Sequence, residues 1–152
     1  MTPGTQITDY LIDRLSQITP ANGYYTAAGT RVHRGRADHM ADAQEDAFPA
    51  ILIRTESDPP AASRPGQVQH TRSFTVQGVI QATGEDYEPT LDALAHDLYR
   101  ALVPQGNRDR LGGLATELTI DGCDYVHPEP GSELAAVSYP ITVTYVATYQ
   151  QQ

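Results

Sequence analysis

Two stretches of the chain repeat their apolar residues every three or four positions, the spacing that predicts an amphipathic helix. The first runs from Thr5 to Ile18 and ends before Thr19-Pro20. The second runs from Pro89 to Val103 and is stopped by a proline at position 104. The apolar stripes consist of Ile7, Leu11, Leu15 and Ile18 in the first helix, and of Leu91, Leu94, Ala95, Leu98 and Leu102 in the second.

Other stretches alternate apolar and polar residues, the pattern of a strand with one buried face. Residues 71–83 alternate, and residues 137–149 give the clearest case, with Val137, Tyr139 and Ile141 opening a long apolar face. Shorter β-prone runs lie at 50–55 and before Ile120. Alternation favours antiparallel pairing, since buried parallel strands read as continuous apolar runs. We expect an α+β fold: an antiparallel or mixed sheet of about four or five strands, with the two amphipathic helices packed on one face.

A proline-rich segment interrupts this pattern. Ser57 to Gly66 contains Pro59, Pro60 and Pro65 with small residues between them. It predicts a mobile loop that contributes nothing to the core. The length of 152 residues suits one domain over 1–152, and no apolar run is long enough to span a bilayer. The N-terminal residues have no basic region followed by an apolar stretch, so we expect no secretory signal.

The formal net charge is −9, and all ten basic residues are arginines. An acidic protein repels a phosphate backbone, which disfavours a primary role in binding nucleic acid. Arginine's planar fork favours fixed carboxylate pairs at protein interfaces. Cys123 is the only cysteine, so no intrachain disulfide forms, and we expect a small, partly buried side chain there.

Candidate catalytic groups are few. No two of the five histidines have the spacing of a metal site, and no phosphate-binding glycine loop occurs, so no metal or cofactor is predicted. His96 lies on the second helix beside Asp97 and away from the leucine stripe, a position that predicts a solvated side chain. Glu85, Asp86 and Glu88 cluster at the start of that helix, where capping and the helix dipole explain them. We expect a protein without catalytic residues.

Several short strings, in order, resemble the tail terminator proteins of long-tailed phages, the lambda-like minor tail protein family. Phe48-Pro49-Ala50 opens a strand, and a long polar loop and a strand near 74–80 follow. After the second helix come Asp124-Tyr125, an acidic turn with Gly131, and the closing Tyr145-Val146-Ala147-Thr148-Tyr149. The resemblance spans about residues 24–149.

The resemblance implies a virion protein made in the bacterial cytoplasm. It would form a ring, commonly a hexamer, that caps the tail tube at its head-proximal end and stops tube polymerisation. The partners implied are further copies of this chain, the tail tube protein and head–tail connector or neck proteins, with DNA passing through the bore without specific binding and no membrane involved.

In such a ring we expect acidic side chains to line the bore or its rims, because phosphate adhesion there would hinder DNA passage. The candidate bore or rim acids are Asp38, Asp42, Glu45, Asp46, Glu85, Asp86 and Glu88. The candidate interface residues are Arg31, Arg34, Arg36, Pro59, Pro60, Pro65 and Tyr149.

Three alternatives remain open from the residues alone. The first is a different neck or head–tail joining protein, which would also form a ring but would not bind the tube end. The second is a small hydrolase that uses His96 or the carboxylates Glu85, Asp86 and Glu88. The third is an α+β domain that binds a soluble ligand in an apolar pocket.

Overall fold

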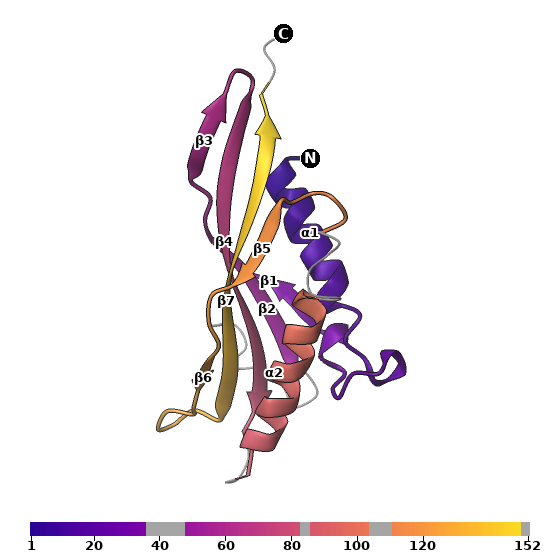
Figure 1. Ribbon diagram of the computed structural model, residues 1–152. Helices are drawn as coiled ribbons and strands as arrows, with labels where there is room; N and C mark the ends of the chain where they lie inside the picture. The colour runs from indigo at the N-terminus through magenta and orange to yellow at the C-terminus, as the bar shows by residue number, and fades with distance from the viewer. Residues whose placement is uncertain (36–47, 83–85, 104–110, 150–152) are drawn as a thin grey trace.

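The computed structural model describes residues 1–35, 48–82, 86–103 and 111–149 (Figure 1). Two α-helices and two short 3-10 helices accompany the strands. The helical elements are α1 (Pro3–Leu15), η1 (Pro20–Asn22), η2 (Ala28–Thr30) and α2 (Glu88–Leu102). The strands are β1 (Val32–Arg34), β2 (Ala50–Ser57), β3 (Pro60–Arg64), β4 (Gln67–Gln81), β5 (Glu117–Ile120), β6 (Asp124–Val126) and β7 (Leu134–Thr148).

The sheet is mixed and has the order β1-β2-β4-β7-β5, with β3 paired to β4 and β6 paired to β7. Only the β1–β2 pair is parallel among the pairings described. Strands β4 and β7 have 15 residues each and pair along their whole length, from Gln67 opposite Thr148 to Gln81 opposite Leu134. The predicted α+β class is confirmed, with seven strands in place of four or five, because strands of three to five residues are too short to display alternation.

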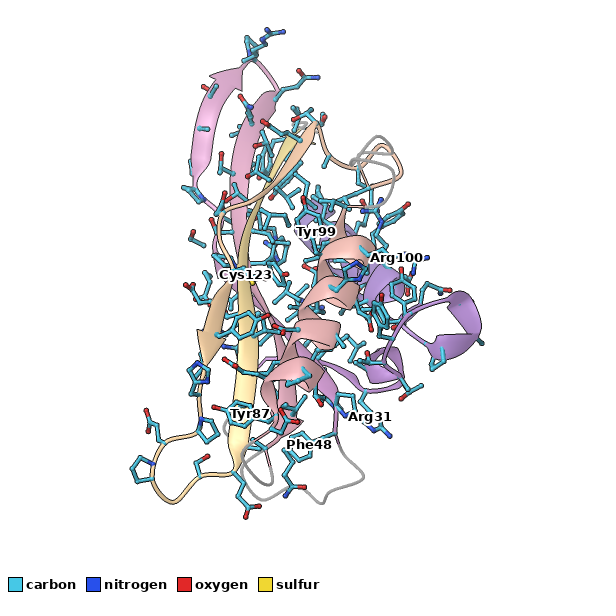
Figure 2. The ribbon with its side chains drawn as sticks, turned by 60° about the horizontal axis from the view of Figure 1, so that its bottom comes forward. Arg31, Phe48, Tyr87, Tyr99, Arg100 and Cys123 are labelled. Atoms are coloured by element: carbon cyan, nitrogen blue, oxygen red, sulfur yellow. The ribbon has the colours of Figure 1, made fainter. Side chains whose placement is uncertain are left out.

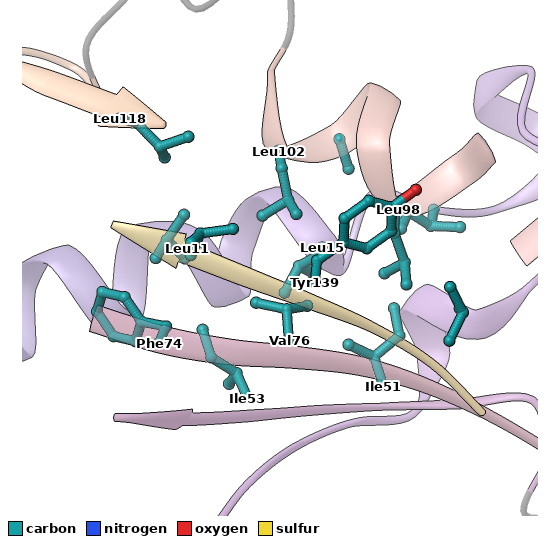
Figure 3. Close-up of a cluster of buried hydrophobic side chains, with 14 of the residues drawn as sticks. Leu11, Leu15, Ile51, Ile53, Phe74, Val76, Leu98, Leu102, Leu118 and Tyr139 are labelled. Carbon is teal, nitrogen blue, oxygen red and sulfur yellow. The ribbon is translucent and has the colours of Figure 1, made fainter. Parts of the chain in front are cut away.

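Both helices cover the same face of the sheet, as predicted, and the opposite face carries a smaller buried cluster of Ala50, Leu52 and Val79 (Figure 1). Their stripes pack on the alternate residues of β2, β4 and β7, which are buried together in one cluster (Figure 3). The approach of α2 is close at Gly78 of β4, where an added Cβ would lie 2.6 Å from Leu94 Cδ2. The helices pack on only part of the β4–β7 pair, and the rest of this pair extends beyond them (Figure 1).

Beyond the helices, β3 and the adjoining halves of β4 and β7 form a three-stranded projection that we call the arm (Figure 1). The arm corrects one prediction, because residues 60–64 form a paired strand and not a loop. Pro60 is the first residue of β3, where a missing N–H is tolerated, and Pro65 with Gly66 (φ 77°) makes the hairpin turn. Every residue of β3 is exposed, so the segment contributes nothing to the core, as expected.

Candidate assembly surfaces

The arm carries an open groove on the face turned away from the helices. Its volume is about 420 Å³, and it is lined by Ala62, Ser63, Arg64, Gln67, Gln69, Thr116 and Val146. Gln69 lies opposite both Ala62 and Val146 in the register, so three neighbouring strands share this face. Val146 is 47% exposed and gives the groove an apolar floor among small and polar side chains.

The base of the arm is fastened by a buried ion pair. Asp58, in the connection between β2 and β3, accepts a hydrogen bond at 2.7 Å from Arg72 of β4. The second terminal nitrogen of Arg72 donates to Thr55 Oγ1 at 3.0 Å and to Thr8 Oγ1 of α1 at 3.3 Å. The two charged side chains are only 13% and 23% exposed for Arg72 and Asp58. We call these four residues, together with Tyr145, the clasp.

Aromatic residues complete the clasp. The Tyr145 hydroxyl donates to Asp58 Oδ2 at 2.6 Å, and the His70 ring stacks on the Tyr145 ring at a centroid distance of 5.2 Å. Burial and the bond to Asp58 raise the pKa of the Tyr145 phenol well above its ordinary value. His70 Nδ1 lies 3.1 Å from Asp58 Oδ1, and its Nε2 lies 3.0 Å from the Tyr149 hydroxyl. The clasp thus joins α1, β2, β4 and β7 at the point where the arm leaves the body.

Arg64 at the tip of the arm is an exposed cation. Of the seven arginines in the described residues, the other six each make a hydrogen bond or an ion pair. Arg64 makes neither within the described part of the chain, although it lines the groove. An unpaired guanidinium fixed on an ordered strand is well placed to meet an anionic partner.

Exposed acids gather on and around β6. Asp121, Asp124, Glu129 and Glu133 are all exposed, on β6 and in the segments on either side of it. The β6–β7 connection projects at the far end from the arm tip (Figure 1). These acids were not chosen as site residues from the sequence, although their density over residues 121–133 was visible there. Their distance from the arm became clear only from the fold.

The predicted interface residues separate into two places. Pro59, Pro60, Pro65 and Tyr149 are exposed on or beside the arm. Arg31 and Arg34 lie instead near the parallel edge strand β1, and Arg36 lies outside the described residues. Arg31 donates to the Pro49 carbonyl at 3.4 Å and lies close to Phe48 (Figure 2), whereas Arg34 lies 3.8 Å from Asp9.

Two of the predicted bore or rim acids can be placed. Asp86 and Glu88 are exposed at the start of α2. Glu85 and the other four acids, Asp38, Asp42, Glu45 and Asp46, lie outside the described residues. Of the carboxylates of the alternative hydrolase site, Glu88 therefore lies in the first turn of α2 and Asp86 just before it, whereas His96 lies two turns further along the helix.

His96 and its neighbour Asp97 have opposite surroundings. His96 is exposed, as predicted, and meets the Tyr25 ring edge-on at 5.3 Å. Asp97 is fully buried and accepts hydrogen bonds from the backbone N–H groups of Tyr25 (3.0 Å) and Thr26 (2.8 Å). No pattern in the sequence indicates that this carboxylate is buried, because its hydrogen-bond donors lie more than 70 positions earlier in the chain. Its role is structural: it holds residues 25–26 against α2.

The outer side of α2 presents aromatic rings and a guanidinium (Figure 2). Tyr99 is 52% exposed, and Arg100 stacks over the Tyr24 ring at 4.4 Å. Across the sheet edge, Tyr125 donates to Asp92 at 2.6 Å, and this bond, with burial, raises the pKa of Tyr125 to about 12. Cys123 is exposed and not partly buried as expected, because it lies in the irregular segment between β5 and β6.

Two features are absent from the described residues. Among residues 1–35, 48–82, 86–103 and 111–149, no three His, Cys, Asp or Glu side chains gather closely enough to hold a metal ion. No helix in these ranges is long and apolar enough to cross a bilayer.

Comparison with known proteins gives a similarity of fold alone. No protein-family model matches the chain, and no curated protein matches it. Among solved structures, the chain is similar to a chain from the virion of a native gene transfer agent (GTA) particle. That similarity covers 93% of this chain and 98% of the other at a TM-score of 0.57 and 16% sequence identity. The two chains therefore share an architecture over nearly their whole lengths.

Proposed function

We propose that this protein is a structural component of a phage-like particle, and that it acts as a tail terminator. In this role it forms a ring, a hexamer in the simplest case, on the end of the tail tube. The ring stops tube polymerisation and offers a surface for joining the head. The observation that carries the proposal is the fold, which matches a virion chain over 98% of that chain's length.

Features of the surface support an assembling role. The arm projects from the body, is fastened by the clasp, and carries a groove and the exposed Arg64. An enzyme with such an arm would need a catalytic centre elsewhere on the molecule. The groups that a hydrolase could use there include His96 and Glu88, and both are exposed on α2. We therefore propose a protein that works through contacts and catalyses no reaction.

The charge distribution is also part of the proposal. The acids at the start of α2, Asp86 and Glu88, together with Glu85 and the acidic 38–46 segment, line the bore or its rims. Arg31, Arg34 and Arg36, with the arm residues Pro59, Pro60, Pro65 and Tyr149, contribute to contacts between subunits or with partners. A ring built in this way repels the phosphate backbone and lets DNA pass.

The direct test combines mass and tube binding. The purified chain is measured by native mass spectrometry, alone and after incubation with tubes assembled from the tail tube protein encoded near it. We expect a closed homo-oligomer, and gold-labelled protein at one end of each tube in electron micrographs. A ring that leaves tube ends bare would identify a neck or head–tail joining protein instead. A chain that stays monomeric with and without tubes would refute the proposal.

The bore charge has its own test. The assembled ring is mixed with a linear DNA duplex at about 20 mM salt, where electrostatic attraction is weakly screened. We expect no retention of the duplex on a filter. Tight retention, or a bore lined by Arg31 and Arg34 in a reconstruction of the ring, would show that the acids lie elsewhere.

A further inference from the structure

Arg64 and the groove beside it form an incomplete binding site. Arg64 is exposed at the end of β3 and has no ion pair or hydrogen bond in the described part of the chain. The clasp and the full pairing of β4 with β7 hold the strand that carries it. Because the strand that carries Arg64 is already ordered, binding here costs little further backbone entropy, which favours a specific partner over a diffuse one.

The turn between β6 and β7 has the complementary chemistry. Glu129 lies between Pro128 and Pro130 and is exposed, and its carboxylate has no partner among the described residues. The turn is ordered by a bond from the Ser132 N–H to the Glu129 carbonyl at 2.9 Å, and Gly131 supplies the positive φ of 86°. Pro130 and Gly131 fix the backbone of this turn, so that it docks into a groove at low entropic cost.

These two surfaces cannot meet within one molecule. The arm tip and the β6–β7 turn lie at opposite ends of the long β4–β7 pair (Figure 1). Fifteen paired residues separate the ends, about 50 Å at the usual rise per residue. A contact between them must therefore join two copies, and it joins different surfaces of each, which is the head-to-tail geometry that closes into rings.

We infer that the arm groove of one subunit receives the Pro128–Gly131 turn of a second copy, with Arg64 of the first bound to Glu129 of the second. The inference rests on the proposed ring and names the contact that builds it. The edge of β3 is a poor surface for adding another strand, because Pro60 lacks an N–H and charged Arg64 ends the strand. The groove face has no such obstacle, and its small residues and Val146 leave room for proline rings.

The test is a charge exchange between two full-length variants. Arg64→Glu and Glu129→Arg each place like charges at every contact of a ring made from one variant alone. We expect each variant alone to assemble about tenfold more weakly than the wild type. An equal mixture restores an opposite pair at every contact when the two variants alternate. We expect the mixture to recover wild-type assembly, with equal numbers of both variants when one is isotopically labelled for native mass spectrometry.

The controls separate this contact from the fold and from the ring itself. Arg54→Glu changes an exposed arginine outside the groove and is expected to leave assembly unchanged. Circular dichroism of each variant checks that the fold is retained. A wild type that assembles while Arg64→Glu assembles equally well overturns the contact and leaves the proposed function standing. Failure of the mixture to recover also overturns the contact, whereas a wild type that never assembles refutes the ring and this contact together.

Discussion

Breaking the clasp should reveal how strongly the arm is fixed to the body. Asp58→Asn removes the charge opposite Arg72 while keeping a side chain of the same size. Arg72 would then face a neutral amide and the hydroxyls of Thr8 and Thr55, with its own side chain only 13% exposed. Removing one partner of a fully buried pair costs about 3–5 kcal/mol, and the partial exposure here reduces this to about 2–3 kcal/mol.

The expected loss is measured by thermal and urea unfolding. For a chain of this size, about 2–4 °C of Tm corresponds to 1 kcal/mol, so Asp58→Asn should lower Tm by about 4–12 °C. Arg72→Met should behave similarly, because it removes the guanidinium beside Asp58 and leaves that carboxylate with Tyr145 and His70 alone. The double variant removes both charges and should cost less than the sum of the single variants by about 1–3 kcal/mol. Hydrogen exchange should quicken in β3 in each single variant, since the arm loses its attachment.

A matched control exists on the sheet surface. Arg54 and Glu56 lie at the same 2.7 Å separation, but their side chains are 50% and 42% exposed. The cycle made from Arg54→Met and Glu56→Gln should give a coupling below about 1 kcal/mol, which salt removes. The clasp coupling should persist in 1 M salt. Equal couplings in the two cycles, or additive effects of Asp58→Asn and Arg72→Met, would refute the view that burial gives the clasp its strength.

Three further results are expected. Gly78→Ala should lower the free energy of unfolding by about 1–3 kcal/mol in urea titrations, because the new methyl meets a leucine of α2 at 2.6 Å. The control Gly122→Ala, with its nearest contact at 3.5 Å, should change it by less than about 0.5 kcal/mol, and similar losses in both variants would contradict the packing. Asp97→Ala should lower the free energy of unfolding by about 2–3 kcal/mol, because buried hydrogen bonds are lost, whereas the adjacent His96→Ala should lower it by less than about 1 kcal/mol. The reverse order of the two variants in thermal unfolding would refute the assigned roles. The pKa of Tyr125 is raised to about 12 in the folded chain, so the stability that its hydrogen bond contributes should be complete below about pH 10 and lost as the pH rises towards 12. Tyr125→Phe should remove this part of the pH dependence of the free energy of unfolding in urea titrations, and an unchanged pH profile would contradict the prediction.

The periodicity of the sequence determined the elements with long repeats. The residues of both helical stripes are buried, and so is the alternating face of β7 from Ala135 to Ala147. These patterns are strong because burial of one face constrains every second or every third to fourth residue over 13–15 positions. The α+β class and the placement of both helices on one face followed from the same constraint.

Short segments and non-local contacts were decided only by the tertiary structure. Residues 60–64 became a strand because β4 extends past the helices and offers a partner, which no local pattern in a proline-rich segment could indicate. The clasp required Asp58 to meet Arg72 and Tyr145, which lie 14 and 87 positions away in the chain. Asp97 became buried because residues 25–26, more than 70 positions earlier, present two N–H groups to it. A polar residue is buried where distant groups satisfy its hydrogen bonds, and the sequence does not specify which groups will be there.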